Sequence, residues 1–531
     1  MVHSHDSRSS GASLSADIAP ILVIGAGPHA LALVLTLLEE HASSEFTERD
    51  TIHMGFWTKK LGRKNTSSGK HEKPHAVTAS ASLRRQIRVL DPSGAWCSTW
   101  NHNFATFGIS HLRSPVSVHL DPLRPEGLRD FATSTNQLAS QVTEPPPSIR
   151  FNRRNRAFTT NTSLFSENDR PFFGCPSREL FADFHAYLIK LYGIHSMVEK
   201  AKAVSIEPLH FACHDSPHFK VTCADGNVIV AKHVVVAIGT QNIPRIPPWA
   251  TSLRQHLDIQ GGMVVHSSDA VLHTLAFSNC LRKKHVLVVG GGLTSVHLVR
   301  QVLTTWGADH ATLVTRKPTL IVQPYDVPVE WMSPLMRAKM LADFFDEPTP
   351  QMKLTRIREA RRGGSVTRSA LAQLNAVTTP ESYTHRGNTQ VTNVERFVAD
   401  GGGHRLRVTL TNGEASAERV VDHIILATGS DIDVSKEVLF DGVRDLGGIP
   451  VGGLPPIDNE LRWAPNTNLF VMGGYAALQL GPTAGNLMGA RAGANKLAEL
   501  LLEGVATKAS QTRHHHLRAL CGKENLYDFL S

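Results

Sequence analysis

The chain has 531 residues, of which 41% are hydrophobic and 19% are charged, and its formal net charge at pH 7 is +8. This length suggests two or three domains, and the composition is too apolar for a disordered chain. The basic residues form short, widely separated clusters without a nucleic-acid-binding motif, which argues against nucleic acid as a partner. No apolar run reaches the roughly 18 to 20 residues needed to cross a bilayer.

The amino terminus and the cysteines bear on the compartment. Residues 1–18 are polar, lack the apolar core of a secretory signal and are expected to form a disordered lead. The six cysteines are irregularly spaced and include no C-x-x-C pair, so neither a zinc site nor a dithiol redox centre is indicated, and no metal is expected. We therefore expect a cytoplasmic protein whose thiols are buried in a reducing compartment.

The first ordered segment, PILVIGAGPHALALVLTLLEE, has the pattern of a strand, a glycine turn and a helix. Its turn, Gly25-x-Gly27-x-x-Ala30, allows a tight bend and lets backbone N–H groups approach a pyrophosphate at the positive end of the helix. Pro28 and His29 complete this turn. The alternative is a glycine turn that only packs a helix on a strand.

A dinucleotide-binding fold also needs a second parallel strand that ends in an acidic residue roughly 20 positions after the turn. No such segment follows here, because residues 45–86 are polar and resemble a flexible insertion. The run Ile87–Leu90 followed by Asp91 has the required pattern, farther along the chain. We interpret residues 45–86 as a surface insertion and Asp91 as the acid that binds the ribose.

The middle of the chain predicts a hairpin that turns at residues 225–227 and a buried strand Val234–Ile238 ending at Gly239. The segment QNIPRIPPW follows and is expected to cross between domains, because prolines fit neither helix interiors nor central strands. A second strand, turn and helix then begin near residue 285. Residues 353–400 predict only a helix-containing loop region.

The second turn, Gly290-x-Gly292-x-x-Ser295, repeats the geometry of the first, and Arg316 lies at the end of the following strand. A cation there suits the 2′-phosphate of NADPH, whereas an acid would suit NADH. The alternative is a solvated charge at a strand end. A buried strand ending in Gly429, then a short strand, a glycine-rich loop and a long helix complete the pattern.

Two glycine turns in this order, each followed by an A-x-G-[TS] strand end at Ala237–Thr240 or Ala427–Ser430, are more specific than either alone. The pattern resembles the flavin-dependent class B monooxygenases, which include flavin-containing monooxygenases and ornithine and lysine N-hydroxylases. The resemblance implies an α/β fold with two Rossmann-like dinucleotide-binding domains. An NADPH-binding domain (246–430) would be inserted between two parts of an FAD-binding domain (19–245 and 431–506), followed by a tail (507–531).

The resemblance also implies cofactor-binding residues. Those expected to hold FAD are Gly25, Gly27, Pro28, His29 and Asp91. Those expected to hold NADPH are Gly290, Gly292, Ser295 and Arg316, with Gly429 at the later strand end. Trp96 and Trp100 lie in a segment similar to the family's flavin wall. Gly474, Gly481, Pro482 and Asn486 lie in a segment similar to the loop and helix start that close over the flavin. Aromatic packing is an equally open interpretation of the two tryptophans, and a plain helix cap is the alternative for the loop.

Two further features remain less defined. Gly262 and His266 match the family's Gly-x-x-x-His signature only in part, because Gln260 and Ala270 replace its flanking aromatics, so the flavin-containing subgroup is not established. The loop His111–Pro122 is rich in cationic and turn residues, and the sequence assigns it no contact.

The resemblance implies an FAD- and NADPH-dependent monooxygenase that transfers one oxygen atom, through a flavin hydroperoxide, to a small nucleophile such as an amine or thioether. No catalytic side chain is identified. A disulfide reductase is disfavoured because it needs paired cysteines, which makes molecular oxygen the expected acceptor. Two alternatives stay open, an NADPH-dependent flavin oxidoreductase or oxidase, and a regulatory growth-inhibitor-like flavoprotein that binds partners.

Overall fold

The computed structural model describes most of the chain. The described residues are 18–39, 81–124, 126–143, 151–152, 157–158, 173–210, 216–240, 243–254, 262–332, 336–400 and 402–502. Nearly all of the expected amino-terminal lead, residues 45–80 of the expected insertion and the expected tail therefore lie outside them.

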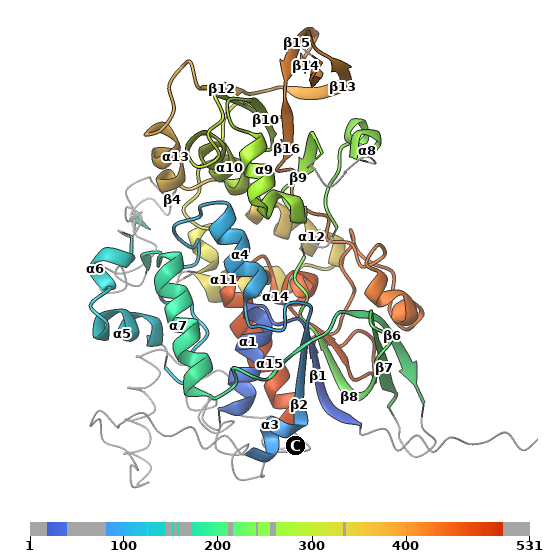
Figure 1. Cartoon of the computed structure of the whole chain (residues 1–531). Helices are drawn as coiled ribbons and strands as arrows, with labels where there is room; N and C mark the ends of the chain where they lie inside the picture. The colour runs from blue at the N-terminus through green and yellow to red at the C-terminus, as the bar shows by residue number, and fades with distance from the viewer. Residues whose placement is uncertain are drawn as a thin grey trace, which may run out of the picture.

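The first unit is built on a seven-stranded sheet in the order β5-β2-β1-β8-β7-β6, with β17 also paired to β8. Its centre is parallel, because β1 (Ala19–Ile24) pairs in parallel with both β2 (Ile87–Asp91) and β8 (Val228–Val236). The other strands of this sheet are β5 (Val198–Lys200), β6 (Ala203–Leu209), β7 (His218–Cys223) and β17 (Leu469–Val471). A parallel centre must be covered by helices. Helices α1 (Pro28–Leu38) and α15 (Leu487–Leu502) pack against each other beside it (Figure 1).

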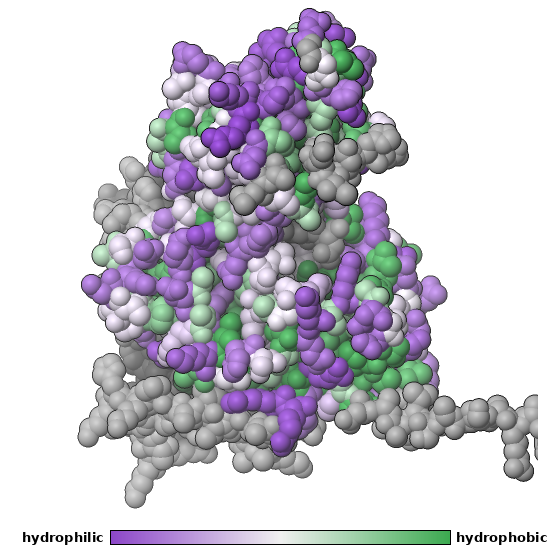
Figure 2. Space-filling model, viewed as in Figure 1, coloured by the Kyte–Doolittle hydropathy of each residue, from purple (hydrophilic) through white to green (hydrophobic). Residues whose placement is uncertain are grey.

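The second unit has a five-stranded parallel sheet in the order β12-β11-β10-β16-β9. Its strands are β9 (Val264–His266), β10 (His285–Val289), β11 (His310–Val314), β12 (Tyr383–Arg386) and β16 (His423–Leu426). All of them lie between β8 and β17 in the chain. A separate antiparallel sheet consists of β13 (Gln390–Val398), β14 (His404–Asn412) and β15 (Ala415–Val421). Figure 2 shows the surface indented on one side between the two units.

The remaining elements connect and cover these sheets. In the first unit they are α3 (Ala81–Gln86), α4 (Ser98–Thr106), α5 (Gly127–Ser134), α6 (Leu138–Gln141), α7 (Arg178–Leu191), η4 (Val438–Leu446), η5 (Gly473–Ala476), α14 (Ala477–Leu480) and the short pair β3 (Phe151–Asn152) and β4 (Ala157–Phe158). Between β8 and β16 they are α8 (Pro248–Arg254), η2 (Ala270–His273), α9 (Leu275–Cys280), α10 (Leu293–Thr304), η3 (Val329–Trp331), α11 (Arg337–Phe345), α12 (Pro350–Arg361) and α13 (Arg368–Asn375).

The chain leaves and re-enters the first unit at one place. The proline-rich segment after β8 runs beside the segment that follows β16. Asp431 N–H donates to Ile243 O at 2.8 Å, and Arg245 N–H donates to Gly429 O at 2.9 Å. Two adjacent crossings therefore connect the units, and the proline-rich segment is one of them.

The mixed α/β fold is confirmed, with one sheet that is parallel at its centre and one that is wholly parallel. Several local predictions need adjustment. Residues 81–86, expected to end the flexible insertion, form helix α3 directly before β2. The strand predicted at Val234–Ile238 is the second half of β8, which begins at the predicted hairpin turn. Residues 353–400 contain β12 and β13 as well as helices. Among the described residues, no helix is long and apolar enough to cross a membrane.

Buried histidines make the stability of this fold pH-dependent. Burial lowers the pKa of His185 to about 3 and the pKa values of His297 and His423 to about 4. An unfolded histidine titrates near pH 6.5. Between about pH 6.5 and about pH 4 the unfolded chain therefore binds more protons than the folded one, and the free energy of unfolding must fall as the pH falls.

His185 offers the sharpest test, because both of its ring nitrogens are buried without a hydrogen-bond partner in the described structure and its ring packs on Phe181. We expect His185→Phe to raise the free energy of unfolding at about pH 5 more than at about pH 7, since it removes one titrating group. Urea unfolding at both pH values measures this. His195→Phe, at an exposed position, is the control, and an equal gain at both pH values for His185→Phe would contradict the interpretation.

Candidate functional site

The first glycine turn joins β1 to α1 and uses its two glycines differently. Gly25 has φ +103°, and a Cβ there would lie 2.5 Å from Ala237 O on the neighbouring strand end. Only glycine fits such a conformation and approach. A Cβ on Gly27, by contrast, would meet no atom within 4 Å. The space in front of the amino terminus of α1 is therefore open to a ligand.

The surroundings of this turn suit the phosphates and ribose of a dinucleotide. Gly27 is the N-cap of α1 and Pro28 its first residue, with no side-chain cap among the described residues, so the first N–H groups of the helix are available to an anion. Asp91, the last residue of β2, accepts a hydrogen bond from Ala26 N–H at 3.0 Å and from Ser93 N–H at 2.9 Å. The predicted acid and the turn therefore meet.

His29 connects this turn to the carboxy-terminal loop. A Cβ on Gly473 would lie 3.7 Å from the His29 ring, and the Nδ1 atom of His29 is buried without a hydrogen-bond partner in the described part of the chain. Burial lowers the pKa of His29 to about 4, opposed in part by a hydrogen bond with the Gly485 backbone. The ring is neutral at pH 7, beside the loop that the sequence places over a flavin.

The second turn, between β10 and α10, repeats this construction. Gly290 has φ +152°, and a Cβ there would clash with Ala427 O. Gly292 is the N-cap of α10, again without a side-chain cap among the described residues. Ser295 is fully buried, and its hydroxyl donates to Gly292 O at 2.7 Å. Ser295 therefore stabilises the turn from within.

A basic strand end and a glycine pair lie beside the second turn. Arg316 is exposed two residues beyond β11, and the carbonyl of Val314 in β11 accepts from Gly290 N–H at 3.1 Å. Lys317 Nζ donates to Arg362 O at 2.9 Å. A Cβ on Gly292 would lie 4.0 Å from Gly364 Cα. The segment after α12 thus covers the open side of the second turn.

A cavity of about 510 Å³ lies where elements of both units meet. The strand ends after β8 and β16 contribute Thr240 and Ser430, and the carboxy-terminal loop contributes Gly474, Pro482 and Gly485. Helix α12 supplies apolar and basic side chains on another side. Ligands of open α/β sheets bind beyond the carboxyl ends of the strands, and this cavity has that position in both sheets.

The cavity carries an excess of positive charge. Its cations are Arg245, Arg358, Arg361 and Lys436, and its carboxylates are Asp431 and Asp433. Arg245 Nε lies 2.8 Å from Asp431 Oδ1, and Lys436 Nζ lies 3.4 Å from Asp433 Oδ2. Each of these ion pairs is neutral in itself, so the excess positive charge of the lining comes from Arg358 and Arg361 of α12. Such a lining favours an anionic ligand.

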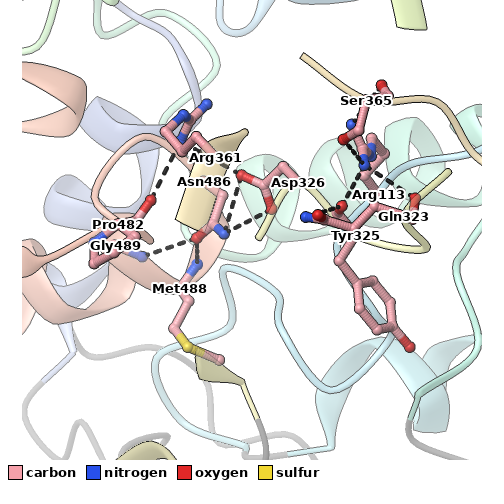
Figure 3. Close-up of polar contacts among 10 residues, drawn as sticks. All are labelled: Arg113, Gln323, Tyr325, Asp326, Arg361, Ser365, Pro482, Asn486, Met488 and Gly489. Carbon is pink, nitrogen blue, oxygen red and sulfur yellow. Dashed lines mark hydrogen bonds and ion pairs between the residues drawn. The ribbon is translucent and has the colours of Figure 1, made fainter. Parts of the chain in front are cut away.

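The carboxy-terminal loop is tied to α12 through a polar network (Figure 3). Arg361 Nη1 donates to Pro482 O at 3.2 Å and lies 3.7 Å from Asp326 Oδ2. Asn486 Nδ2 donates to Asp326 Oδ1 at 3.2 Å, while Asn486 Oδ1 accepts from Met488 N–H at 2.9 Å at the start of α15. Asn486 thus caps the helix and anchors the loop at once.

Other predicted residues lie around this loop or away from it. Gly474 lines the cavity against Thr240, whereas Gly481, with φ +74°, ends α14 and faces α11. Trp96 is buried, and its Nε1–H donates to Ile194 O at 2.9 Å. The ring centroids of Trp100 and Phe104 are 4.0 Å apart. Neither tryptophan is among the described residues that line the cavity, and both make contacts of core packing.

His266 has a defined position at the second crossing. Its Nδ1 accepts from Ser268 N–H at 3.1 Å, which leaves Nε2 to donate to Gly429 O at 3.1 Å. Gly429 has φ +77° and begins the return crossing. The partial Gly-x-x-x-His match therefore corresponds to a link between β9 and the end of β16.

Sequence reasoning missed three side chains of this region, Arg113, Asp326 and Arg361. Arg113, in the loop His111–Pro122, donates to Ser365 O and Gln323 O, each at 3.1 Å, and to Tyr325 O. Burial lowers its pKa to about 10. In the sequence, Arg361 and Arg362 form one of the short, separated basic clusters, for which a solvated surface is the expected position. The signal available was the glycine pair Gly363 and Gly364, two residues after Arg361, which marks a tight turn beside a charge.

Comparisons with known proteins add to this geometry. Residues 184–431 match the family model described as L-lysine 6-monooxygenase/L-ornithine 5-monooxygenase. The ornithine hydroxylase of Pseudomonas aeruginosa is 15% identical, with a TM-score of 0.60, and the alignment covers 92% of this chain and 100% of that one. An ornithine N-hydroxylase from Kutzneria sp. 744, solved with reduced FAD, NADP⁺ and L-ornithine, has 16% identity, the same coverage and a TM-score of 0.60.

A cadaverine monooxygenase from Erwinia amylovora, solved with FAD, is 14% identical over 91% of this chain and 94% of its own, with a TM-score of 0.58. No curated protein sequence matches the chain. At these identities the solved structures establish a shared fold, and the family model covers a central part of the sequence.

The two glycines of the first turn allow a matched pair of substitutions. We expect Gly27→Ala to fold with a free energy of unfolding within about 1 kcal/mol of the wild type, because its Cβ would enter open space. The same methyl group would displace a bound pyrophosphate, so the flavin content of the purified protein should fall. Gly25→Ala should instead destabilise the fold by more than about 1 kcal/mol. Urea unfolding and visible absorbance distinguish the two, and full flavin content in Gly27→Ala would refute the ligand assignment.

Proposed function

We propose that the chain is a flavin-dependent class B monooxygenase that uses FAD, NADPH and molecular oxygen to hydroxylate the nitrogen of a small amine, a proposal that the family match over residues 184–431 and the shared fold support. The observation that carries this proposal is the convergence of two glycine turns and one carboxy-terminal loop. Each turn lies at the carboxyl end of a central strand that pairs in parallel with its neighbours on both sides. The cavity of about 510 Å³ beyond the ends of β8 and β16, which this loop also lines, is large enough for the reacting ends of two cofactors and a small substrate.

FAD belongs at the first turn in this proposal. The open space in front of Gly27 accepts the pyrophosphate, and the uncapped α1 terminus stabilises its charge. Asp91 holds the turn through Ala26 and presents a carboxylate to the ribose. The neutral ring of His29, with an unused buried nitrogen, offers a hydrogen-bonding group where the loop of Gly474 and Pro482 closes over the flavin.

NADPH belongs at the second turn, and the second unit is its binding domain, inserted between two parts of the FAD-binding domain. The uncapped start of α10 at Gly292 receives the pyrophosphate, and Arg316 pairs with the 2′-phosphate. Because Ser295 bonds back to Gly292, its role is to hold the turn. The two adjacent crossings near Gly429 then align the two domains across the cavity.

FAD that has been reduced by NADPH supplies the oxygen chemistry, and the chain supplies position and exclusion of water. The loop from Gly474 to Asn486 covers the cavity on one side and α12 covers it on another. The substrate amine is expected to be small, since the relatives with this fold are described as ornithine, lysine and cadaverine hydroxylases.

The direct test incubates the purified protein with FAD, NADPH, oxygen and a panel of diamines and basic amino acids. NADPH consumption, hydrogen peroxide and product mass are followed together. A product heavier by one oxygen atom, at a yield that matches the NADPH consumed, supports the proposal. Peroxide without product on every amine identifies an oxidase instead, and a protein that binds neither FAD nor NADPH is a regulatory or structural member of the fold.

Coenzyme choice gives a separate prediction for Arg316. Removing a cation from a phosphate costs about 1.5 to 3 kcal/mol, so Arg316→Ala should raise the KM for NADPH at least about tenfold and leave the KM for NADH nearly unchanged. Steady-state kinetics with both coenzymes measure this. Arg282→Ala removes an exposed arginine distant in sequence and serves as the control. An equal loss with both coenzymes would exclude Arg316 as the 2′-phosphate ligand.

A further inference from the structure

We propose that Arg361 is a positioning residue that couples occupancy of the NADPH turn to the geometry of the FAD loop, through Asp326 and Asn486. This inference rests on the proposed function, because it assumes that both turns bind their cofactors. It concerns how the two sites influence each other, which neither the family match nor the fold specifies.

On the FAD side, the guanidinium of Arg361 meets the loop at two points. Nη1 donates to Pro482 O at 3.2 Å, and a Cβ on Gly485 would lie 3.7 Å from the same nitrogen. Gly485 also contacts the proposed flavin-site residue His29. The position of Arg361 therefore determines where the loop turns as it closes over the cavity (Figure 3).

Asp326 provides a second connection to the same loop. Its carboxylate lies 3.7 Å from Arg361 and accepts from Asn486 Nδ2 at 3.2 Å. The Asn486 amide is oriented without ambiguity, because its oxygen accepts from Met488 N–H and Gly489 N–H at the start of α15. The Asp326 carboxylate thus contacts both Asn486, at the end of the loop, and Arg361, which binds the loop at Pro482.

On the NADPH side, Arg361 is the last residue of α12, and the segment after it covers the second turn. Arg362, Gly363 and Gly364 all have positive φ values. A Cβ on Gly364 would lie 3.5 Å from Gly292 Cα, and Lys317 next to Arg316 holds Arg362 O at 2.9 Å. A pyrophosphate in front of Gly292 would therefore contact this segment directly.

Arg113 makes the connection rigid. Its guanidinium donates to the Ser365 carbonyl and hydroxyl at 3.1 and 2.9 Å and to the carbonyls of Gln323 and Tyr325. Ser365 follows the glycine pair, and Tyr325 precedes Asp326. One side chain thus joins the segment over the second turn to the segment that carries Asp326. A shift of residues 362–365 caused by coenzyme is therefore transmitted to the FAD loop.

The test is a linkage measurement. The dissociation constant of FAD is determined by fluorescence titration with and without saturating NADP⁺. We expect NADP⁺ to tighten FAD binding at least about fivefold in the wild type, the lower end of ordinary coupling between sites. In Arg361→Met and Asp326→Asn the change should fall below about twofold, and the double variant should match the single ones, because residues of one network do not act additively.

The variants separate the coupling from simpler explanations. Asp326→Asn is isosteric and does not line the cavity, so loss of coupling in Arg361→Met alone would indicate a direct charge effect and overturn the proposal. Asn486→Asp keeps the helix cap but sets two carboxylates against each other, and it should also abolish coupling. Glu359→Gln removes an exposed charge from the same helix and should preserve coupling. Equal thermal midpoints verify folding.

The outcome also separates this inference from the function on which it rests. A wild-type protein that binds both FAD and NADP⁺ without mutual influence overturns the coupling and leaves the proposed function intact. A wild-type protein that binds neither nucleotide removes both. Wild-type coupling in all the variants would overturn the role of Arg361 while keeping both binding sites.

Discussion

The backbone carbonyl of Ala237 lies against Gly25, and that of Ala427 lies against Gly290. Each approach is so close that the glycine position has no room for a side chain. Each pair forms where a central parallel strand ends and a helix must begin immediately. The approach turns the helix so that its free N–H groups face the space beyond the strand ends. Three features depend on this repeated constraint. They are the open space in front of Gly27, the contact between Asp91 and Ala26, and the cavity where the two units meet.

The features that the sequence predicts correctly are those set by neighbours along the chain. A glycine with a forced φ, a strand of alternating or continuous apolar residues and an acid at a strand end are local patterns, and Gly25, Gly290 and Asp91 all lie where such patterns place them. The order of the two turns then defines the class of fold. Recognition of Asp91 needed one more step, since a polar segment separates it from its turn.

The features that sequence reasoning missed arise between segments distant in the chain. Arg113 and Asp326 acquire their roles only when distant segments meet, and nothing in the residues beside them indicates that meeting. For Trp96 the sequence left a flavin wall and aromatic packing equally open, and only the fold shows that its indole N–H donates to Ile194 O. In the β13–β15 sheet, which sequence reasoning missed, β13 and β15 are largely exposed and lack the apolar alternation of a half-buried strand. Strand β14 does show it, at Leu406, Val408 and Leu410, and that signal was not used.

The return of the chain to the first sheet has a consequence for synthesis on the ribosome. Strand β17 pairs with β8, and α15 packs on α1, yet all strands of the second unit are translated between them. The second unit can close on itself as soon as β16 emerges, because its strands and crossovers are contiguous. Until β17 and α15 are made, the part of β8 that pairs with β17 has no partner strand there, and α1 lacks the helix that covers it. Exposed apolar surface during that interval invites aggregation, so a nascent chain that stalls after β16 is expected to need chaperone protection in its amino-terminal half.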